Sequence, residues 1–233
     1  MRTVMRLQYA ADERANKVCT DHAELFDGIP GAQKTRLALD GYVTESRQQG
    51  AIMAQARQLR RAAVLRCADA RAAGRKAAKA VVRVGKLVKM PGLPDSVTNH
   101  LALPGQMSDH DYLFFLQGML DLVHPFEQAF AAEGMPPDVL NNLAASITEL
   151  RAAKAAKDAA TETASAAAEK LNELHRLSAT AIAALEAIAV NVPEANPEVV
   201  TKLRMAMRVG PRSNAGDTPA GSTAPAATAP KAS

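Results

Sequence analysis

Cys19 and His22 are the residues of this chain whose types and spacing come nearest to nucleophilic chemistry. They stand three residues apart, so on a helix their side chains can touch. A working nucleophile also needs a group that orients its base and donors that bind an oxyanion, and the sequence offers neither. The other cysteine is Cys67, and two cysteines without CxxC spacing make no disulfide framework. We therefore expect two free, buried thiols in a reducing compartment, and no enzyme.

Histidines that stand near acids suggest metal binding, but their spacing does not support it. Di-metal sites in helical bundles need glutamates and Glu-x-x-His motifs that project inward. The nearest match is Asp121-x-x-His124, and the residue three before His175 is an asparagine. His22 and His110 are next to acids in the sequence, yet adjacent residues of a helix point in different directions. We expect no metal and no other cofactor, so a metal or redox bundle is the third function considered.

Motifs of other enzyme classes are missing. The sequence has no glycine-rich phosphate loop, no HExxH and no GxSxG. Catalytic pockets are concave and carry convergent polar groups, for which alanine-lined seams between helices leave little room. No small-molecule substrate is evident.

The composition predicts the secondary structure that holds these residues. Alanine dominates the 48% apolar content, aromatic residues make up 3%, and there is no Trp. Alanine is the strongest helix former, because it loses no side-chain entropy when the helix orders. The chain is therefore predicted to be all-α.

Proline and glycine interrupt the chain at four places, and the stretches between them predict the helices. Ser108 is the expected N-cap of the third helix, with Asp111 close to a capping-box position. Pro137 is expected at the first position of the fourth. Whether the second helix kinks near Gly50 is left open. The four predicted helices span residues 6–26, 33–88, 109–132 and 137–191.

Small apolar residues recur at steps of three and four along both long helices. This pattern is typical of a bundle or coiled coil with closely spaced axes. The order of short helix, turn, long helix and breaker occurs twice, which suggests an internal duplication; chance resemblance is the alternative. We predict an elongated antiparallel bundle of two similar helical hairpins, residues 1–104 and 105–209. Residues 210–233 are rich in Pro, Ala and Thr and are predicted to be a disordered tail.

The third predicted helix is apolar almost all round, so it is either central in the fold or covered by a partner. Acids such as Asp109 and Asp121 argue against insertion into an anionic membrane surface. The candidate core or partner contacts are Tyr112, Phe114, Phe115, Met119, Phe126 and Phe130.

Charge is sharply segregated along the chain. Residues 57–89 carry eleven Lys or Arg and one acid, whereas residues 90–149 carry eight acids and no Lys or Arg. A helix with this density of cations could follow the phosphates of a nucleic acid. The candidate polyanion-binding residues are Arg57, Arg60, Arg61, Arg71, Arg75, Lys76, Lys79, Arg83 and Lys86.

Two alternatives to nucleic-acid binding stay open for the basic helix. The acids of the third helix, such as Asp109 and Asp121, could fold back beside the second helix and neutralise it internally. Alternatively, a basic face of one molecule could bind an acidic face of another copy or of a protein partner. No zinc-finger spacing or helix-turn-helix supports a specific nucleic-acid module.

The chain shows no targeting or membrane signal. Residues 1–15 are charged throughout and lack the apolar region of a signal peptide, and no apolar run approaches the ~20 residues that a membrane span needs. We expect a cytoplasmic protein without membrane contact. The function ranked first is a non-enzymatic structural or interaction protein that binds a protein partner or itself through its helix faces. The second is a nucleic-acid-associated protein that uses the basic helix 57–89.

Overall fold

The structure is a computed structural model, which describes residues 3–87, 101–103, 105–191 and 197–208. All regular structure in these residues is helical, which confirms the predicted all-α class. The helices are α1 (Thr3–Asp21), α2 (Ala23–Asp27), α3 (Pro30–Leu87), α5 (Asp109–Val123), the 3-10 turn η1 (His124–Phe126), α6 (Glu127–Ala132), α7 (Val139–Asn191) and α8 (Pro197–Ala206). The predicted tail at 210–233 and Lys89 lie outside the described residues, as does the side chain of Lys86.

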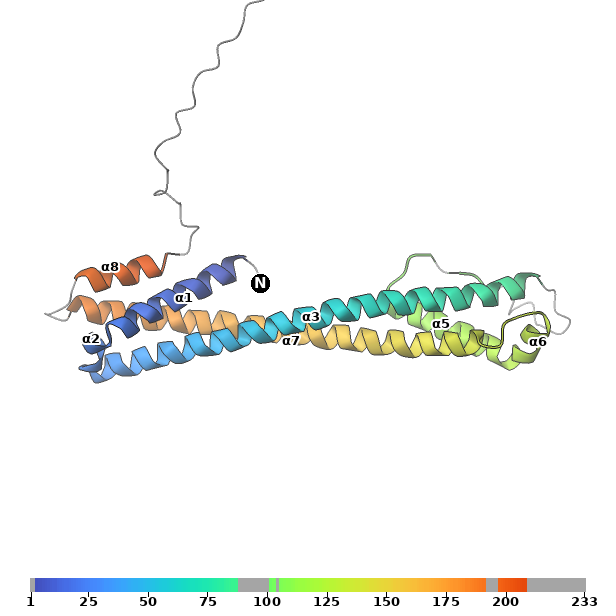
Figure 1. Cartoon of the computed structure of the whole chain (residues 1–233), viewed down its shortest axis with the longest axis horizontal. Helices are drawn as coiled ribbons and strands as arrows, with labels where there is room; N and C mark the ends of the chain where they lie inside the picture. Colours follow the sequence, from blue (N-terminus) through green and yellow to red (C-terminus); the bar gives the residue numbers. More distant parts are fainter. Residues whose placement is uncertain (1–2, 88–100, 104, 192–196, 209–233) are drawn as a thin grey trace, which may run out of the picture.

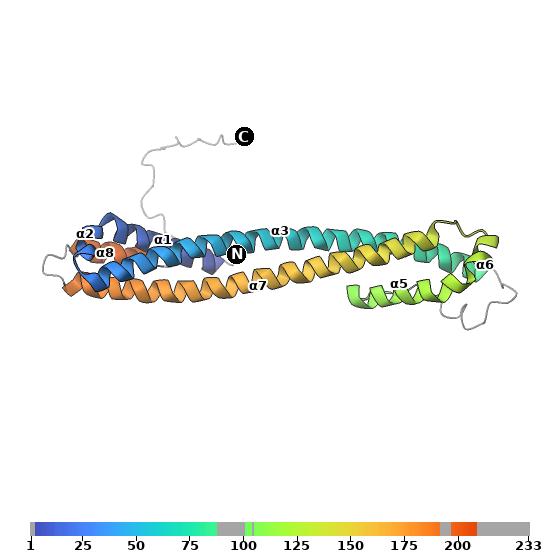
Figure 2. The same ribbon diagram turned by 90° about the horizontal axis from the view of Figure 1, so that it is seen from below.

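Two long helices form the body of the molecule. α3 and α7, of 58 and 53 residues, run antiparallel and pack against each other along a rod (Figure 1). α1, α2 and α8 lie at one end of this rod, and α5, η1 and α6 lie at the other (Figure 2). The elongated antiparallel bundle predicted from the sequence is thus confirmed.

The predicted start is confirmed for α5 and is two residues too early for α7. Ser108 caps α5 as predicted, because its Oγ accepts a hydrogen bond from the Asp111 backbone N–H at 3.1 Å. α7 begins at Val139, two residues after the predicted start at Pro137. Asp138 then sits just before the helix, where its backbone carbonyl and its side chain both accept from Asn142.

Both short helices predicted as continuous are broken in the structure. The stretch 6–26 divides at His22, whose φ of −122° and ψ of 38° are not helical, and the chain then turns so that Phe26 is fully buried. The stretch 109–132 divides at Pro125, because proline has no N–H for the helical hydrogen bond and its ring crowds the preceding turn. The prediction treated both segments as single helices and was wrong on each.

α8 was not predicted at all. The prediction treated residues 192–197, including Pro197, as an interruption that follows the last helix. Proline is well suited to the first turn of a helix, however, because its missing N–H has no partner to lose there. Val199, Leu203 and Ala206 form its buried face. This face packs on α1 and α7, so α8 closes one end of the rod.

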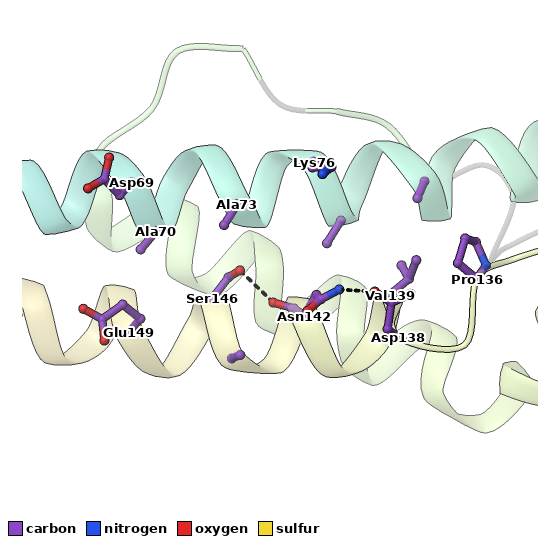
Figure 3. A pocket seen from close by; sticks show the side chains of 13 residues that line it. Asp69, Ala70, Ala73, Lys76, Pro136, Asp138, Val139, Asn142, Ser146 and Glu149 are labelled. Atoms are coloured by element: carbon purple, nitrogen blue, oxygen red, sulfur yellow. Dashed lines mark hydrogen bonds between the residues drawn. The ribbon is translucent and has the colours of Figure 1, made fainter.

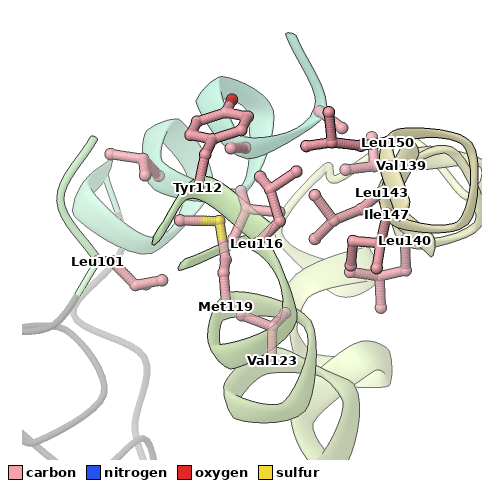
Figure 4. Packing of buried hydrophobic residues seen from close by; sticks show 14 of the residues in the cluster. Leu101, Tyr112, Leu116, Met119, Val123, Val139, Leu140, Leu143, Ile147 and Leu150 are labelled. Atoms are coloured by element: carbon pink, nitrogen blue, oxygen red, sulfur yellow. The ribbon is translucent and has the colours of Figure 1, made fainter. Parts of the chain in front are cut away.

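The end of the rod near α5 has a core of large side chains. Leu116 and Val123 of α5 and Leu143 and Leu150 of α7 are fully buried there, together with Phe130 of α6. Figure 4 shows these α5 and α7 leucines meeting across the interface. The opposite end has a second core, formed by Phe26, Leu39, Ile182, Leu185 and Leu203.

α3 runs as one helix through Gly50, so it has no break there. Two of its other glycines lie where a neighbouring side chain approaches closely. A Cβ at Gly74 would lie 2.7 Å from a methyl carbon of Leu116, and one at Gly85 would collide with Leu101. These glycines therefore let α5 and the following chain pack close to the α3 backbone.

Candidate functional site

Among the described residues, the middle of the rod is formed by α3 and α7. We call this region the waist, and define it as residues 48–66 of α3 and 158–170 of α7; α1 begins on one side of it and α5 on the other (Figures 1 and 2). Its seam is closed by Met53, Ala56, Ala63 and Ala160, all buried. Ile52, Leu59, Val64 and Leu65 of α3 are exposed there, by 40%, 57%, 46% and 66%. Large exposed apolar side chains thus gather where the rod is thinnest.

An open groove follows the α3–α7 seam beside the waist. It has a volume of about 660 Å³ and lies on the face of the two helices opposite α5, whose ribbon is behind them in Figure 3. Its buried lining is apolar except for Ser146, whose hydroxyl donates to the Asn142 carbonyl, and its walls include the exposed alanines Ala73 and Ala145. We call it the seam groove, and its lining residues are Asp69, Ala70, Ala73, Lys76, Ala77, Ala80, Pro136, Asp138, Val139, Asn142, Ala145, Ser146 and Glu149.

A second apolar groove, of about 490 Å³, continues along the waist. It is lined by Ile52 and Leu59 on α3 and by Ala156 and Ala159 on α7. Arg66 forms an ion pair with Glu149, with a nitrogen and an oxygen 2.7 Å apart, at the junction between the two grooves. The face opposite α5 is therefore apolar and open along much of the coil.

The cations of α3 are mostly exposed and without internal partners. Arg60, Arg61, Arg75, Lys76, Lys79 and Arg83 are exposed, and Arg57 is half-buried. Within the described part of the chain, none of these seven side chains makes an ion pair. This set contains the predicted polyanion-binding residues except Lys86, whose side chain is not described, and Arg71.

Arg71 belongs to an internal cluster instead. Its guanidinium donates to Asp109 at 2.8 Å and to the Met107 carbonyl at 2.9 Å, and it stacks over the Tyr112 ring at 4.7 Å. Asp109 also accepts from Lys157 of α7 at 2.5 Å. Hydrogen bonds from Lys157 and then Arg71 lower the pKa of Asp109 below its ordinary value. The cluster joins three helices, so Arg71 is not offered to a ligand.

Internal neutralisation of the basic helix is therefore partial. Of the acids at 90–149 that the structure describes, Asp109 and Glu149 pair with α3, through Arg71 and Arg66. Asp111 bonds with Ser108, Asp121 accepts from Gln117 on the same helix, and Asp138 accepts from Asn142 at the start of α7. Most of the positive charge of α3 stays directed toward solvent.

The aromatic candidates divide between core and surface. Tyr112, Met119 and Phe130 are buried, and Phe115 and Phe126 are half-buried. Phe114 is 66% exposed, with the His110 ring edge-on to it at 4.7 Å. α5 is thus covered by α3 and α7 on one side only.

The residues proposed for nucleophilic chemistry are not arranged for it. Cys19 is fully buried, and burial raises the pKa of its thiol to about 12. Burial also raises the pKa of Cys67. In the described ranges, no group of three or more His, Cys, Asp or Glu residues could hold a metal ion.

One buried acid–imidazole pair was missed by sequence reasoning. Asp12 of α1 is 2% exposed, and its Oδ2 lies 2.9 Å from Nδ1 of His175 on α7. Its Oδ1 is buried and has no hydrogen-bond partner. Burial raises the pKa of Asp12, although the hydrogen bond with His175 opposes this. The pair lies 163 residues apart in the chain, so spacing within one helix could not reveal it.

Comparison with known proteins adds no relative. No family model matches this chain, and no curated protein or solved structure matches it. Among the described helices, none combines the length and apolar character that a bilayer crossing requires.

Proposed function

We propose that this protein is a non-enzymatic interaction protein of the cytoplasm, in which the seam groove of one copy packs against the seam groove of a second. The main observation behind the proposal is the arrangement of charges along the edge of the groove. Two exposed residues of opposite charge, Asp69 and Lys76, stand seven residues apart on the same side of α3, with exposed Ala73 between them.

The lining of the groove suits contact with another helix. Ala73 of α3 (labelled in Figure 3) and Ala145 of α7 both line the groove and are exposed. Side chains this small allow a second pair of helices to approach closely, since the distance between packed helices follows the size of the residues between them. Exposed apolar surface that is rimmed by polar residues is typical of an interaction site.

The charges make the groove complementary to itself. Asp69 and Lys76 are about 10.5 Å apart along the helix axis, and neither makes an ion pair among the described residues. If a second copy lies antiparallel, with a two-fold axis at Ala73, Asp69 of each copy faces Lys76 of the other. Such two-fold contacts, in which both subunits use the same patch, are the commonest form of homodimer.

The cysteines and the histidine that could take part in catalysis are buried or hydrogen-bonded within the fold, which supports a non-enzymatic role. Cys19 and Cys67 are free but buried thiols. His175 is bonded to buried Asp12. Free cysteines also fit the reducing conditions of a cytoplasm.

The first test is the mass of the protein by light scattering across a wide concentration series. The unaltered chain should approach the mass of a dimer as concentration rises. Ala145→Glu places a charge in the groove and should keep the protein monomeric. Ala155→Glu is the matched control, because Ala155 is exposed on the same helix outside both grooves, and it should dimerise normally. A monomer at every concentration for the unaltered chain would contradict the proposal.

A charge exchange tests the geometry itself. Asp69→Lys should weaken the dimer, because each copy then brings a second cation against Lys76 of the other. Adding Lys76→Asp restores opposite charges at both contacts and should restore the dimer. If the double variant is as monomeric as the single one, the antiparallel arrangement is wrong.

A further inference from the structure

We propose that α3 carries a second binding surface, which takes the phosphate backbone of duplex nucleic acid without reading its sequence. Apart from Arg83, its residues lie off the line of Asp69 and Lys76 that edges the seam groove, and it does not depend on the proposed dimer. We call it the cationic face, and it consists of Arg57, Arg60, Arg61, Arg75, Lys79 and Arg83.

The cationic face is rigid and its charge is not cancelled internally. All six residues belong to one uninterrupted helix, and they extend over about 39 Å. In the described part of the structure none of them makes an ion pair. On α7, Asp158 is bound to Lys154 at 2.7 Å, and Glu162 is exposed and makes no ion pair with the described cations of α3.

Arg60 is the independent sign that this surface serves a ligand. It occupies a position of the seven-residue repeat by which α3 faces α7, and the matching positions Met53, Cys67 and Val81 are all buried. Arg60 is exposed instead. An apolar residue would pack there, so the arginine weakens the coil at its thinnest point, and no described acid compensates it. Departures from packing rules of this kind are expected at functional sites.

The alignment of the other cations fits an extended polyanion. Arg61 and Arg75 are fourteen residues apart, which is two full repeats of the coil, so they lie on one line along the rod. Lys79 follows Arg75 by one turn. A straight row of cations can neutralise successive phosphates along one side of a duplex.

A membrane surface fits this face less well than a duplex. Peripheral helices bind anionic lipid with a broad apolar face beside their cations. Among the described residues, no exposed large hydrophobic side chain lies between residues 75 and 83, where three of the six cations stand. Near the other cations, Leu59, Val64 and Leu65 are exposed. Leu59 lines the second groove, and the remaining two residues do not form a broad apolar face.

A single strand also fits less well than a duplex. Proteins that bind single strands stack the bases on aromatic side chains. The one aromatic residue of α3 is Tyr42, which is half-buried beside α1 and far along the helix from the cationic face. The surface offers cations for phosphates and nothing that stacks on a base.

The proposal predicts a steep dependence on salt. The probe is a fluorescently labelled DNA duplex of random sequence, titrated with the full chain and followed by anisotropy. If five phosphates are neutralised, the dissociation constant should rise about 500-fold between about 50 and about 200 mM salt. No binding at low salt, or binding that does not respond to salt, overturns the proposal.

Matched double variants locate the site. Arg75→Gln with Lys79→Gln removes two cations of the face, and should reduce that 500-fold change to about 40-fold as well as weaken binding. Lys17→Gln with Lys34→Gln removes the same charge from exposed residues elsewhere and should leave the salt dependence unchanged. Equal effects of the two double variants would show that only net charge matters, and would overturn the assignment.

Two competing ligands complete the test. Vesicles that contain phosphatidylserine and a single strand of the same length should both compete more weakly than unlabelled duplex. Stronger competition by either one contradicts the choice of duplex. Arg60→Ala should weaken duplex binding while it raises the thermal midpoint of the protein; a lower midpoint would mean that Arg60 serves the fold.

Discussion

The ends of the rod and its waist are built on the same two helices but from different side chains. At the ends, a third helix covers the seam and buries leucines and phenylalanines such as Leu116 and Phe130. In the waist the seam is closed mainly by alanines such as Ala56 and Ala160, and no other described helix covers it. Large residues bury several times the apolar area of alanine, so stability is concentrated at the ends. The waist and the adjoining grooves are left exposed.

The most severe test of this comparison removes a large side chain at one end. Phe130 is fully buried, and its ring lies against the α3 backbone at Gly85. Phe130→Ala should lower the free energy of unfolding by about 3–5 kcal/mol, because it removes apolar contacts and leaves a cavity. Denaturant unfolding followed by circular dichroism measures this. A loss below about 1 kcal/mol would mean that the α5 end is loosely packed and does not differ from the waist.

The second test removes the charge that joins α5 to both long helices. Asp109→Asn should cost about 2 kcal/mol, less than for a fully buried pair because the Asp109 side chain is 21% exposed. The remaining cations Arg71 and Lys157 would lack their anion. Hydrogen exchange should then show α5 opening while α1 stays protected.

The pH dependence of that effect has a definite sign. The pKa of Asp109 is lower in the folded protein than in the unfolded chain, so its ionised form stabilises the fold. This contribution is fully present above the unfolded value of about 3.9 and is lost as pH falls through the folded pKa. The difference between the unaltered chain and Asp109→Asn should therefore be constant from about pH 7 to about pH 5 and shrink below about pH 4. A difference that grows in acid would contradict the assigned role.

The third test concerns the opposite end, where the buried acid Asp12 should give a pH dependence of stability opposite to that of Asp109. Burial raises the pKa of Asp12, so the folded state binds more protons there than the unfolded chain does. Its contribution to stability falls as pH rises from about 4 through the raised pKa. Asp12→Asn should therefore be more stable than the unaltered chain at about pH 7, by about 1 kcal/mol, and should lose this advantage in acid.

The groups that face Asp12 make this measurement interpretable. His175 bonds it from α7, and the Glu13–Arg47 pair with Tyr9 lies beside it between α1 and α3. His175→Gln keeps a polar side chain on α7 and serves as the companion variant. If Asp12→Asn is less stable than the unaltered chain at neutral pH, the bond to His175 outweighs the burial of the charge.

The sequence was sufficient for the two long helices and for the start of α5, and insufficient for the short helices around them. Ser108 and the proline-free stretches located α3, α5 and α7, because capping and helix breaking are local effects. Local signals were misread at Pro125 and Pro197, since the same residue can end one helix and begin another.

The arrangement of the candidate sites depended on contacts that no local pattern encodes. The periodicity of α3 shows which residues face α7, but not which side of the seam α5 will cover. That choice decides that Ala73 and Ala145 stay open while Gly74 is buried. The pairing of Arg71 with Asp109, and of Asp12 with His175, likewise required the register between helices that are distant in sequence.

The smallest expected effect is the one most particular to the waist. Leu59 is 57% exposed and lines the second groove, so Leu59→Ala should change the free energy of unfolding by less than about 0.5 kcal/mol. Leu116→Ala is its counterpart at the α5 end, where the leucine is fully buried, and it should cost about 2–5 kcal/mol. Denaturant unfolding of both variants at low concentration measures the contrast. If Leu59→Ala lowers the free energy of unfolding as much as Leu116→Ala does, then Leu59 is covered in solution, and the second groove is already part of an interface.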